Sequence, residues 1–124
     1  MSSICINDNI ISQFIHFYYT SLNNKQFENV KKFLREYTEI VFESNLITGF
    51  ENIIKYYSNL ILSTIKFEII DVSMTSFSGR RCNILIFGNL RTNKQEEKNF
   101  VESIVFQQGK KNNFWIHSVI FRLI

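Results

Sequence analysis

The spacing of apolar residues along the chain has a helical period first and a strand period later. Between residues 8 and 22, apolar side chains recur every three or four positions, which is typical of an amphipathic helix, and Asn7 or Asp8 can cap its start. The same period predicts a second helix at about residues 25–35. It predicts a third that begins at Thr48, where Glu51 completes a capping box, and extends to about Ile61.

The second half of the chain has the alternation of strands. Residues 64–76 predict one long strand, Ser78 and Gly79 a turn, and residues 82–124 three more strands in an antiparallel meander. A short strand pair is expected earlier, at residues 37–42 and 46–47. The sequence therefore predicts an α+β fold, with one domain over residues 1–124 and the helices packed on one face of a sheet.

Both faces of the predicted meander are apolar. Ile84 and Ile86 alternate with Leu85 and Phe87. In the last strand, one face is expected to carry Phe114, Ile116 and Ile120, and the other Trp115, Val119, Phe121 and Leu123. Helices can cover only one face, and a small monomer usually keeps the second face of such a sheet wet. We therefore expect a second copy of the chain to cover the other face, in a homodimer.

Composition narrows the class of protein. The chain has 124 residues, of which 45% are hydrophobic, and a net charge of +3 with acidic residues scattered among the basic ones, so no nucleic-acid partner is expected. No apolar run approaches the roughly 20 residues of a membrane-spanning helix, and no signal peptide is recognisable, so an intracellular protein without a membrane partner is expected. Cys5 and Cys82 form no motif, and the sequence predicts neither a metal nor a cofactor.

An ordered set of short motifs spans nearly the whole chain. It consists of Phe14-Ile15-His16-Phe17-Tyr18-Tyr19, Phe42-Glu43, Gly49 with the helix through Leu60, Gly88-x-Leu90, Asn99-Phe100, and Trp115 through Phe121-Arg122-Leu123. Together these motifs resemble the nuclear transport factor 2 family. The resemblance implies a curved antiparallel sheet closed by three helices on its concave side into a cone, with the outer sheet faces paired in a dimer.

The resemblance also implies a function. Members of the family carry the GDP form of the GTPase Ran into the nucleus and bind the Phe-x-Phe-Gly repeats of nucleoporins. The expected location is therefore cytoplasm and nucleus, with enrichment at the nuclear envelope. The implied Ran-binding residues are Phe42, Glu43, Leu60, Ile65, Ile120 and Phe121, and the implied nucleoporin-binding residues are Ile6, Asn7 and Ile10. The four aliphatic and aromatic residues Leu60, Ile65, Ile120 and Phe121 are equally compatible with an ordinary core.

Several positions depart from the family pattern. Two aspartates expected in the loop after Gly88-x-Leu90 are replaced by Asn93 and Gln95, and the nearby acidic residues Glu96 and Glu97 lie between Lys94 and Lys98. Asn7 stands where the family has a tryptophan linked to nucleoporin binding. In the family, acidic residues at the rim of the cone mouth pair with lysine and arginine of Ran. The resemblance therefore predicts a less acidic rim here, and weaker binding of nucleoporin repeats.

Two other functions compete with a Ran carrier. Ketosteroid isomerase and scytalone dehydratase share the cone and use its hollow for catalysis, which needs a base and a hydrogen-bond donor. The candidate bases are His16, His117 and Asp71, and the candidate donors are Tyr18, Tyr19, Tyr56 and Tyr57. These candidates form no recognisable set, so the sequence predicts that the protein is not an enzyme. The second alternative is a subunit that pairs with a larger homologue, as in the bulk mRNA export receptor.

Overall fold

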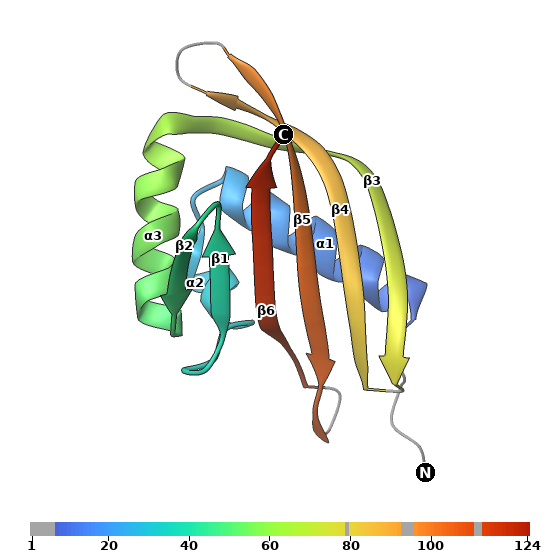
Figure 1. The fold of residues 1–124 in the computed structure, drawn as a ribbon. Helices are drawn as coiled ribbons and strands as arrows, with labels where there is room; N and C mark the ends of the chain where they lie inside the picture. Colours follow the sequence, from blue (N-terminus) through green and yellow to red (C-terminus); the bar gives the residue numbers. More distant parts are fainter. Residues whose placement is uncertain (1–6, 79, 93–95, 111–112) are drawn as a thin grey trace.

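Six strands form one curved sheet in the order β2-β1-β6-β5-β4-β3, and three helices pack against it (Figure 1). The structure is a computed structural model that describes residues 7–78, 80–92, 96–110 and 113–124, without the side chains of residues 60–65 and 76–78. The elements are α1 (Asp8–Asn23), α2 (Phe27–Lys31), β1 (Glu39–Phe42), β2 (Asn45–Thr48), α3 (Phe50–Ser63), β3 (Thr64–Ser78), β4 (Arg81–Thr92), β5 (Glu97–Gln108) and β6 (Phe114–Leu123). The predicted α+β fold is confirmed.

Helix α1 begins where the sequence predicts. The side chain of Asn7 accepts a hydrogen bond from the backbone N–H of Ile10 at 3.0 Å, which satisfies one of the free donors of the first turn. At the other end, the backbone N–H of Asn24 still bonds to the carbonyl of Thr20, and Lys25 then turns the chain at a φ of 59°. The buried face of α1 crosses the inner face of the sheet, where Phe14 packs on Phe106 with ring centroids 4.4 Å apart.

The other two helices differ from the sequence prediction at their ends. Helix α2 ends at Lys31 rather than near residue 35, because the carbonyl of Phe33 accepts a hydrogen bond from the N–H of Ile116 in β6 at 2.7 Å. Helix α3 begins at Phe50, since Thr48 still belongs to β2. Between them, Gly49 has a φ of 90° and donates its N–H to the carbonyl of Thr38. Tertiary hydrogen bonds therefore override the local pattern.

Strand β6 contains a β-bulge that changes which residues face inward. Phe106 pairs with Ile116 whereas Val105 pairs with Ser118, so His117 is an extra residue. Ile116, Val119 and Phe121 are consequently buried on the inner face, and Ile120 is 49% exposed on the outer face. The predicted grouping of Ile120 with Ile116 is wrong, because a bulge reverses the alternation that follows it.

The inner face of the sheet is filled by aromatic rings. Phe42 stacks on Phe121 at a centroid distance of 4.7 Å, Phe121 stacks on Phe100 at 4.9 Å, and Tyr19 of α1 lies over Phe100 at 6.3 Å. All four side chains are buried. The outer face is different, since Leu85 and Ile120 each remain nearly half exposed there. An apolar outer face agrees with the expected homodimer, which stays a prediction.

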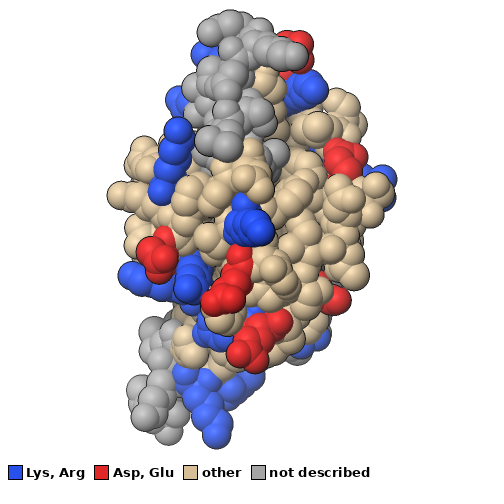
Figure 2. All heavy atoms as spheres, turned by 90° about the vertical axis from the view of Figure 1, so that its left-hand side faces the viewer, with Lys and Arg blue, Asp and Glu red and all other residues tan. Residues whose placement is uncertain are grey.

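Charged side chains are mixed on the surface. Figure 2 shows Lys and Arg lying among Asp and Glu on the left-hand side of the view in Figure 1, without a basic stripe. Among the described residues, no helix is long and apolar enough to cross a membrane.

Candidate functional site

The turn between β1 and β2 places Phe42 and Glu43 next to the end of β6. Phe42 is buried between Phe121 and Tyr56, whose ring centroids are 4.7 and 5.2 Å away. Glu43 has a φ of 57°, an unfavourable conformation for a side chain of this size. Two contacts hold it: its N–H donates to the carbonyl of Phe121 at 2.9 Å, and its Oε1 accepts from the N–H of Leu123 at 2.6 Å.

The implied Ran-binding residues are only partly brought together. Phe42, Glu43 and Phe121 form one contact group at the end of the inner face. Ile120 lies on the opposite face of the sheet, because of the bulge at His117. The side chains of Leu60 and Ile65 lie outside the described residues.

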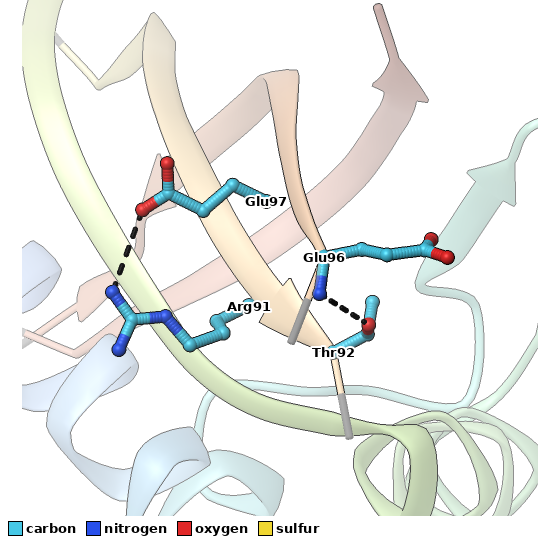
Figure 3. Close-up of polar contacts among 4 residues, drawn as sticks. All are labelled: Arg91, Thr92, Glu96 and Glu97. Atoms are coloured by element: carbon cyan, nitrogen blue, oxygen red, sulfur yellow. Dashed lines mark hydrogen bonds and ion pairs between the residues drawn. The ribbon is translucent and has the colours of Figure 1, made fainter. Parts of the chain in front are cut away.

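Two glutamates where the β4–β5 loop enters β5 are paired within the chain. Oε1 of Glu97 lies 3.4 Å from the guanidinium of Arg91 (Figure 3). Oε2 of Glu96 lies 4.0 Å from the Lys98 ammonium. The backbone N–H of Glu96 also donates to the Thr92 hydroxyl at 3.3 Å. These exposed ion pairs add little stability, but they offset the negative charge of the loop. Asn93, Lys94 and Gln95 lie outside the described residues.

An apolar groove of about 450 Å³ lies between α1, the segment after α2, and the end of the sheet where β5 leads into β6. It is lined by Ile10, Gln13, Phe14, Phe17, Phe33, Phe106 and Phe114. We call it the phenylalanine groove. Phe14 meets Phe33 edge to face at 5.0 Å, Phe106 stacks on Phe114 at 5.5 Å, and Phe17 is 39% exposed at the rim.

Of the implied nucleoporin-binding residues, only Ile10 lines this groove. Asn7 serves as the cap of α1, and Ile6 lies outside the described residues. Sequence reasoning did not assign Phe17, Phe33 and Phe114 to a surface site. The 13 phenylalanines of the chain were the available signal, since not all of them fit in a core of this size.

A buried acid lies at the centre of the inner face. Glu102 is 3% exposed, and its Oε1 has no hydrogen-bond partner among the described residues. Burial raises the pKa of this carboxyl to about 8, so Glu102 is mostly neutral near pH 7. Tyr18 lies near it, and the Tyr18 and Tyr57 hydroxyls are hydrogen-bonded at 2.5 Å.

Burial also raises the pKa of both tyrosines, to about 12 for Tyr57 and well above the usual value for Tyr18. Both hydroxyls therefore stay protonated. Sequence reasoning named Tyr18 and Tyr57 as donors but missed Glu102. The alternation of Phe100, Glu102 and Ile104 in a single strand indicates an inward position and could have revealed it.

The other candidate catalytic residues do not converge. His16 is exposed on α1, and His117 lies at the β6 bulge beside Tyr37, with ring centroids 6.3 Å apart. Asp71 is exposed rather than inward, because Ile70 forms a second bulge and Asp71 then pairs with Phe87. No group of three metal-ligating side chains occurs within the described part of the chain.

Comparison with known proteins identifies the fold family. The model of the nuclear transport factor 2 domain matches residues 10–123. A nuclear transport factor 2 structure from Cryptosporidium parvum is 21% identical with a TM-score of 0.81, covering 98% of this chain and 100% of that one. The yeast UBP3-associated protein BRE5 is 18% identical with a TM-score of 0.80, covering 96% and 98%. No curated protein matches the chain.

Enzymes are also among the similar structures. A hexachlorocyclohexane dehydrochlorinase from Novosphingobium barchaimii is 11% identical with a TM-score of 0.77, covering 91% of this chain and 83% of that one. The prediction that the protein is not an enzyme is therefore corrected. The fold is shared by carriers and enzymes, and at these identities it decides for neither.

Proposed function

The chain belongs to the nuclear transport factor 2 domain family, and we propose that it is a nuclear import carrier that binds Ran-GDP and Phe-x-Phe-Gly nucleoporin repeats. The carrier acts as a homodimer and moves between cytoplasm and nucleus, with enrichment at the nuclear envelope. The observation that carries the proposal is the phenylalanine groove.

The phenylalanine groove suits an aromatic side chain in size and chemistry. A cavity of about 150 Å³ is enough to bind benzene, so about 450 Å³ has room for both rings of one repeat. Edge-to-face and offset-stacked contacts with Phe14, Phe33 and Phe114 would each add roughly 0.5–1.5 kcal/mol beyond burial. The partly exposed ring of Phe17 gives an incoming phenylalanine a surface to cover.

Ran binding is supported by the geometry around Glu43. One carboxylate oxygen is held by Leu123, and Oε2 has no hydrogen-bond partner among the described residues, so it is free to pair with a basic residue of Ran. An aromatic side chain of Ran enters the cone mouth beside Phe42, and its burial is worth roughly 1.5–3 kcal/mol. Because Glu96 and Glu97 are already paired, Glu43 supplies most of the acidic recognition.

A peptide assay tests the carrier proposal. A fluorescent Phe-x-Phe-Gly peptide is titrated with the wild type and with Phe17→Lys, and binding is followed by anisotropy. We expect Phe17→Lys to weaken binding at least tenfold, which corresponds to about 1.4 kcal/mol. Tyr37→Lys is the matched control, since Tyr37 is an exposed aromatic away from the groove. Equal binding by Phe17→Lys and wild type would place the repeat site elsewhere.

Acid–base catalysis inside the cone is a second candidate function, favoured by Glu102. A carboxyl with a pKa of about 8 can give and take protons near neutral pH, and the Tyr18–Tyr57 pair supplies a donor beside it. Catalysis stands second because Glu102 lines neither the phenylalanine groove nor a second groove, of about 520 Å³, between α1 and β3. The test is exchange of α-protons of a small cyclic ketone in D₂O, followed by NMR. Exchange that Glu102→Gln leaves unchanged rules out this role.

A further inference from the structure

Strand β3 forms one edge of the sheet, and part of that edge is covered by a side chain. Within the described ranges, β3 has β4 as its single strand neighbour. At Phe67, the amide of Asn23 accepts from the backbone N–H at 2.8 Å and donates to the backbone carbonyl at 3.0 Å. Asn23 thus makes the two hydrogen bonds that a neighbouring strand would make. The backbone N–H and C=O of Phe67 therefore point away from β4.

Among the described residues, no side chain covers the edge beyond Phe67 in this way. Backbone N–H and C=O groups point to alternate sides along a strand, and the bulge at Ile70 adds one residue to this count. Those of Ile69, Val72 and Met74 therefore also point away from β4. The backbone N–H of Val72 donates to Oδ1 of Asp71 at 3.0 Å, its single hydrogen bond in the described part of the chain. Val72, which faces the groove described next, is 39% exposed. An exposed apolar edge of this kind is a template for pairing with another strand.

A groove of about 520 Å³ lies along the same part of β3. It is lined by Asp8, Ile11, Ser12, Ile15 and His16 of α1 and by Ile69, Val72 and Met74 of β3. We call it the edge groove. The first turns of α1 reach past β3 in Figure 1, so a strand added to this edge would lie beneath them. Because a cavity of about 150 Å³ is enough for one benzene ring, the edge groove has room for about three apolar side chains.

The charge around the edge groove favours one kind of occupant. Asp8 is exposed at one end of the groove, and Asp71 is exposed on the strand itself. The orientation of α1 along the groove follows from Tyr19, whose ring centroid lies 6.0 Å from that of Phe67. Asp8 lies about three helical turns before Tyr19, so it is at the opposite end of the groove, near Met74. A basic residue near Met74 would therefore meet negative charge.

We propose that β3 accepts an extended segment of a partner protein as an additional strand. The segment pairs its backbone with Ile69, Val72 and Met74 and inserts apolar side chains, at alternate positions, into the edge groove. A lysine or arginine at one end of the segment lies beside Asp8. This site is separate from the phenylalanine groove, and it holds whether or not the protein carries Ran.

A designed peptide tests this proposal. The probe is Lys-Val-Thr-Phe-Thr-Val-Gln, labelled with a fluorophore, and the control peptide has asparagine in place of its valines and phenylalanine. We expect saturable binding of the probe to the wild-type protein, and slower amide exchange at Ile69 and Met74 when it is bound. Val72→Lys places a charge in the groove and should weaken binding at least tenfold, or about 1.4 kcal/mol.

Two matched variants sharpen the outcome. Ile70→Lys makes the same change on the same strand outside the groove, and should change the affinity by less than about threefold. Asp8→Asn should reduce the salt dependence of binding.

The proposal is overturned by absence of binding at millimolar peptide, by equal affinity of Val72→Lys and wild type, or by slowed amide exchange elsewhere than in β3. Self-association that Val72→Lys abolishes would also overturn it, because a second copy would then be the occupant. These outcomes concern the edge groove alone, and they are independent of the Phe-x-Phe-Gly assay with Phe17→Lys.

Discussion

Glu43 and Leu123, 80 residues apart in the chain, are joined by a hydrogen bond of 2.6 Å from the Leu123 backbone N–H to the Glu43 carboxylate. The bond fixes the β1–β2 turn to the end of β6, beside the stacked rings of Phe42 and Phe121. Glu43 therefore has a structural task in addition to its proposed contact with Ran. Any substitution at this position affects both, and a useful experiment must separate them.

Glu43→Gln and Glu43→Lys together make that separation. The glutamine keeps an acceptor for Leu123 but removes the charge, so we expect a small change in stability and a clear loss of affinity for Ran-GDP. The lysine removes the acceptor as well, and should lower the free energy of unfolding by about 1–3 kcal/mol. Chemical denaturation and titration with Ran-GDP measure the two effects. Wild-type affinity in Glu43→Gln would exclude a charge contact with Ran at this position.

Glu102 should make stability depend on pH. Its pKa is about 8 in the folded state, above the ordinary value of an exposed carboxyl, so folding favours the protonated form. The favourable contribution is complete below about pH 4.5 and is lost as pH rises towards 8, by on the order of 1 kcal/mol per pH unit. Glu102→Gln cannot ionise, and it should be more stable than the wild type near pH 8 and similar to it near pH 5.

The comparison needs a control at an exposed carboxyl. Glu97→Gln serves, because Glu97 is exposed at the β4–β5 loop. We expect its urea midpoint to follow the wild-type pH dependence, while that of Glu102→Gln is flatter. Parallel curves for all three proteins would mean that Glu102 is solvated or paired in the folded state.

Thr38 is a buried polar residue whose removal, unlike that of Glu102, should destabilise the protein. Its hydroxyl accepts from the N–H of Arg35 and donates to the carbonyl of Ile116, both at 2.8 Å, and so connects the segment after α2 to β6. Thr38→Val has a similar shape but leaves both partners unsatisfied, and should lower the free energy of unfolding by about 1–3 kcal/mol. Thr20→Val, at an exposed helix position, should cost less in the same denaturation experiment.

Much of the architecture could be predicted because local signals and burial agree. The cap at Asn7, the helical period of α1 and the antiparallel order of the last four strands all agree with the sequence prediction. The predicted alternation failed after His117, in a strand that is apolar on both sides, and after Ile70, which is one of two adjacent isoleucines. Alternation cannot locate a bulge when a one-residue shift exchanges one apolar residue for another.

The candidate sites were harder to predict than the fold. The phenylalanine groove draws on α1, the segment after α2, β5 and β6, so no local pattern contains it. The parallel pairing of β1 with β6, which brings Phe42 beside Phe121, also joins distant segments. Glu102 was overlooked because a single glutamate in a strand is usually solvent-exposed. Its significance comes from its position between Phe100 and Ile104 on the buried face.

The expected homodimer can now be tested at defined positions. Val119 and Phe106 are both buried on the inner face, so arginine at either should unfold the protein rather than dissociate a dimer. Ile120 and Leu85 are instead partly exposed on the outer face, where a second copy would bury them.

A stable interface needs about 800 Å² per subunit, and a buried arginine at its centre would not be tolerated. We therefore expect light scattering to give a dimer mass for the wild type and a monomer mass for Ile120→Arg, with melting temperatures that show both to be folded. The matched control is Tyr37→Arg, an exposed aromatic outside the sheet, which should remain dimeric. If the wild type is a monomer at micromolar concentration, the homodimer prediction is wrong. A different partner, such as a larger homologue in a heterodimer, would then have to cover the apolar outer face.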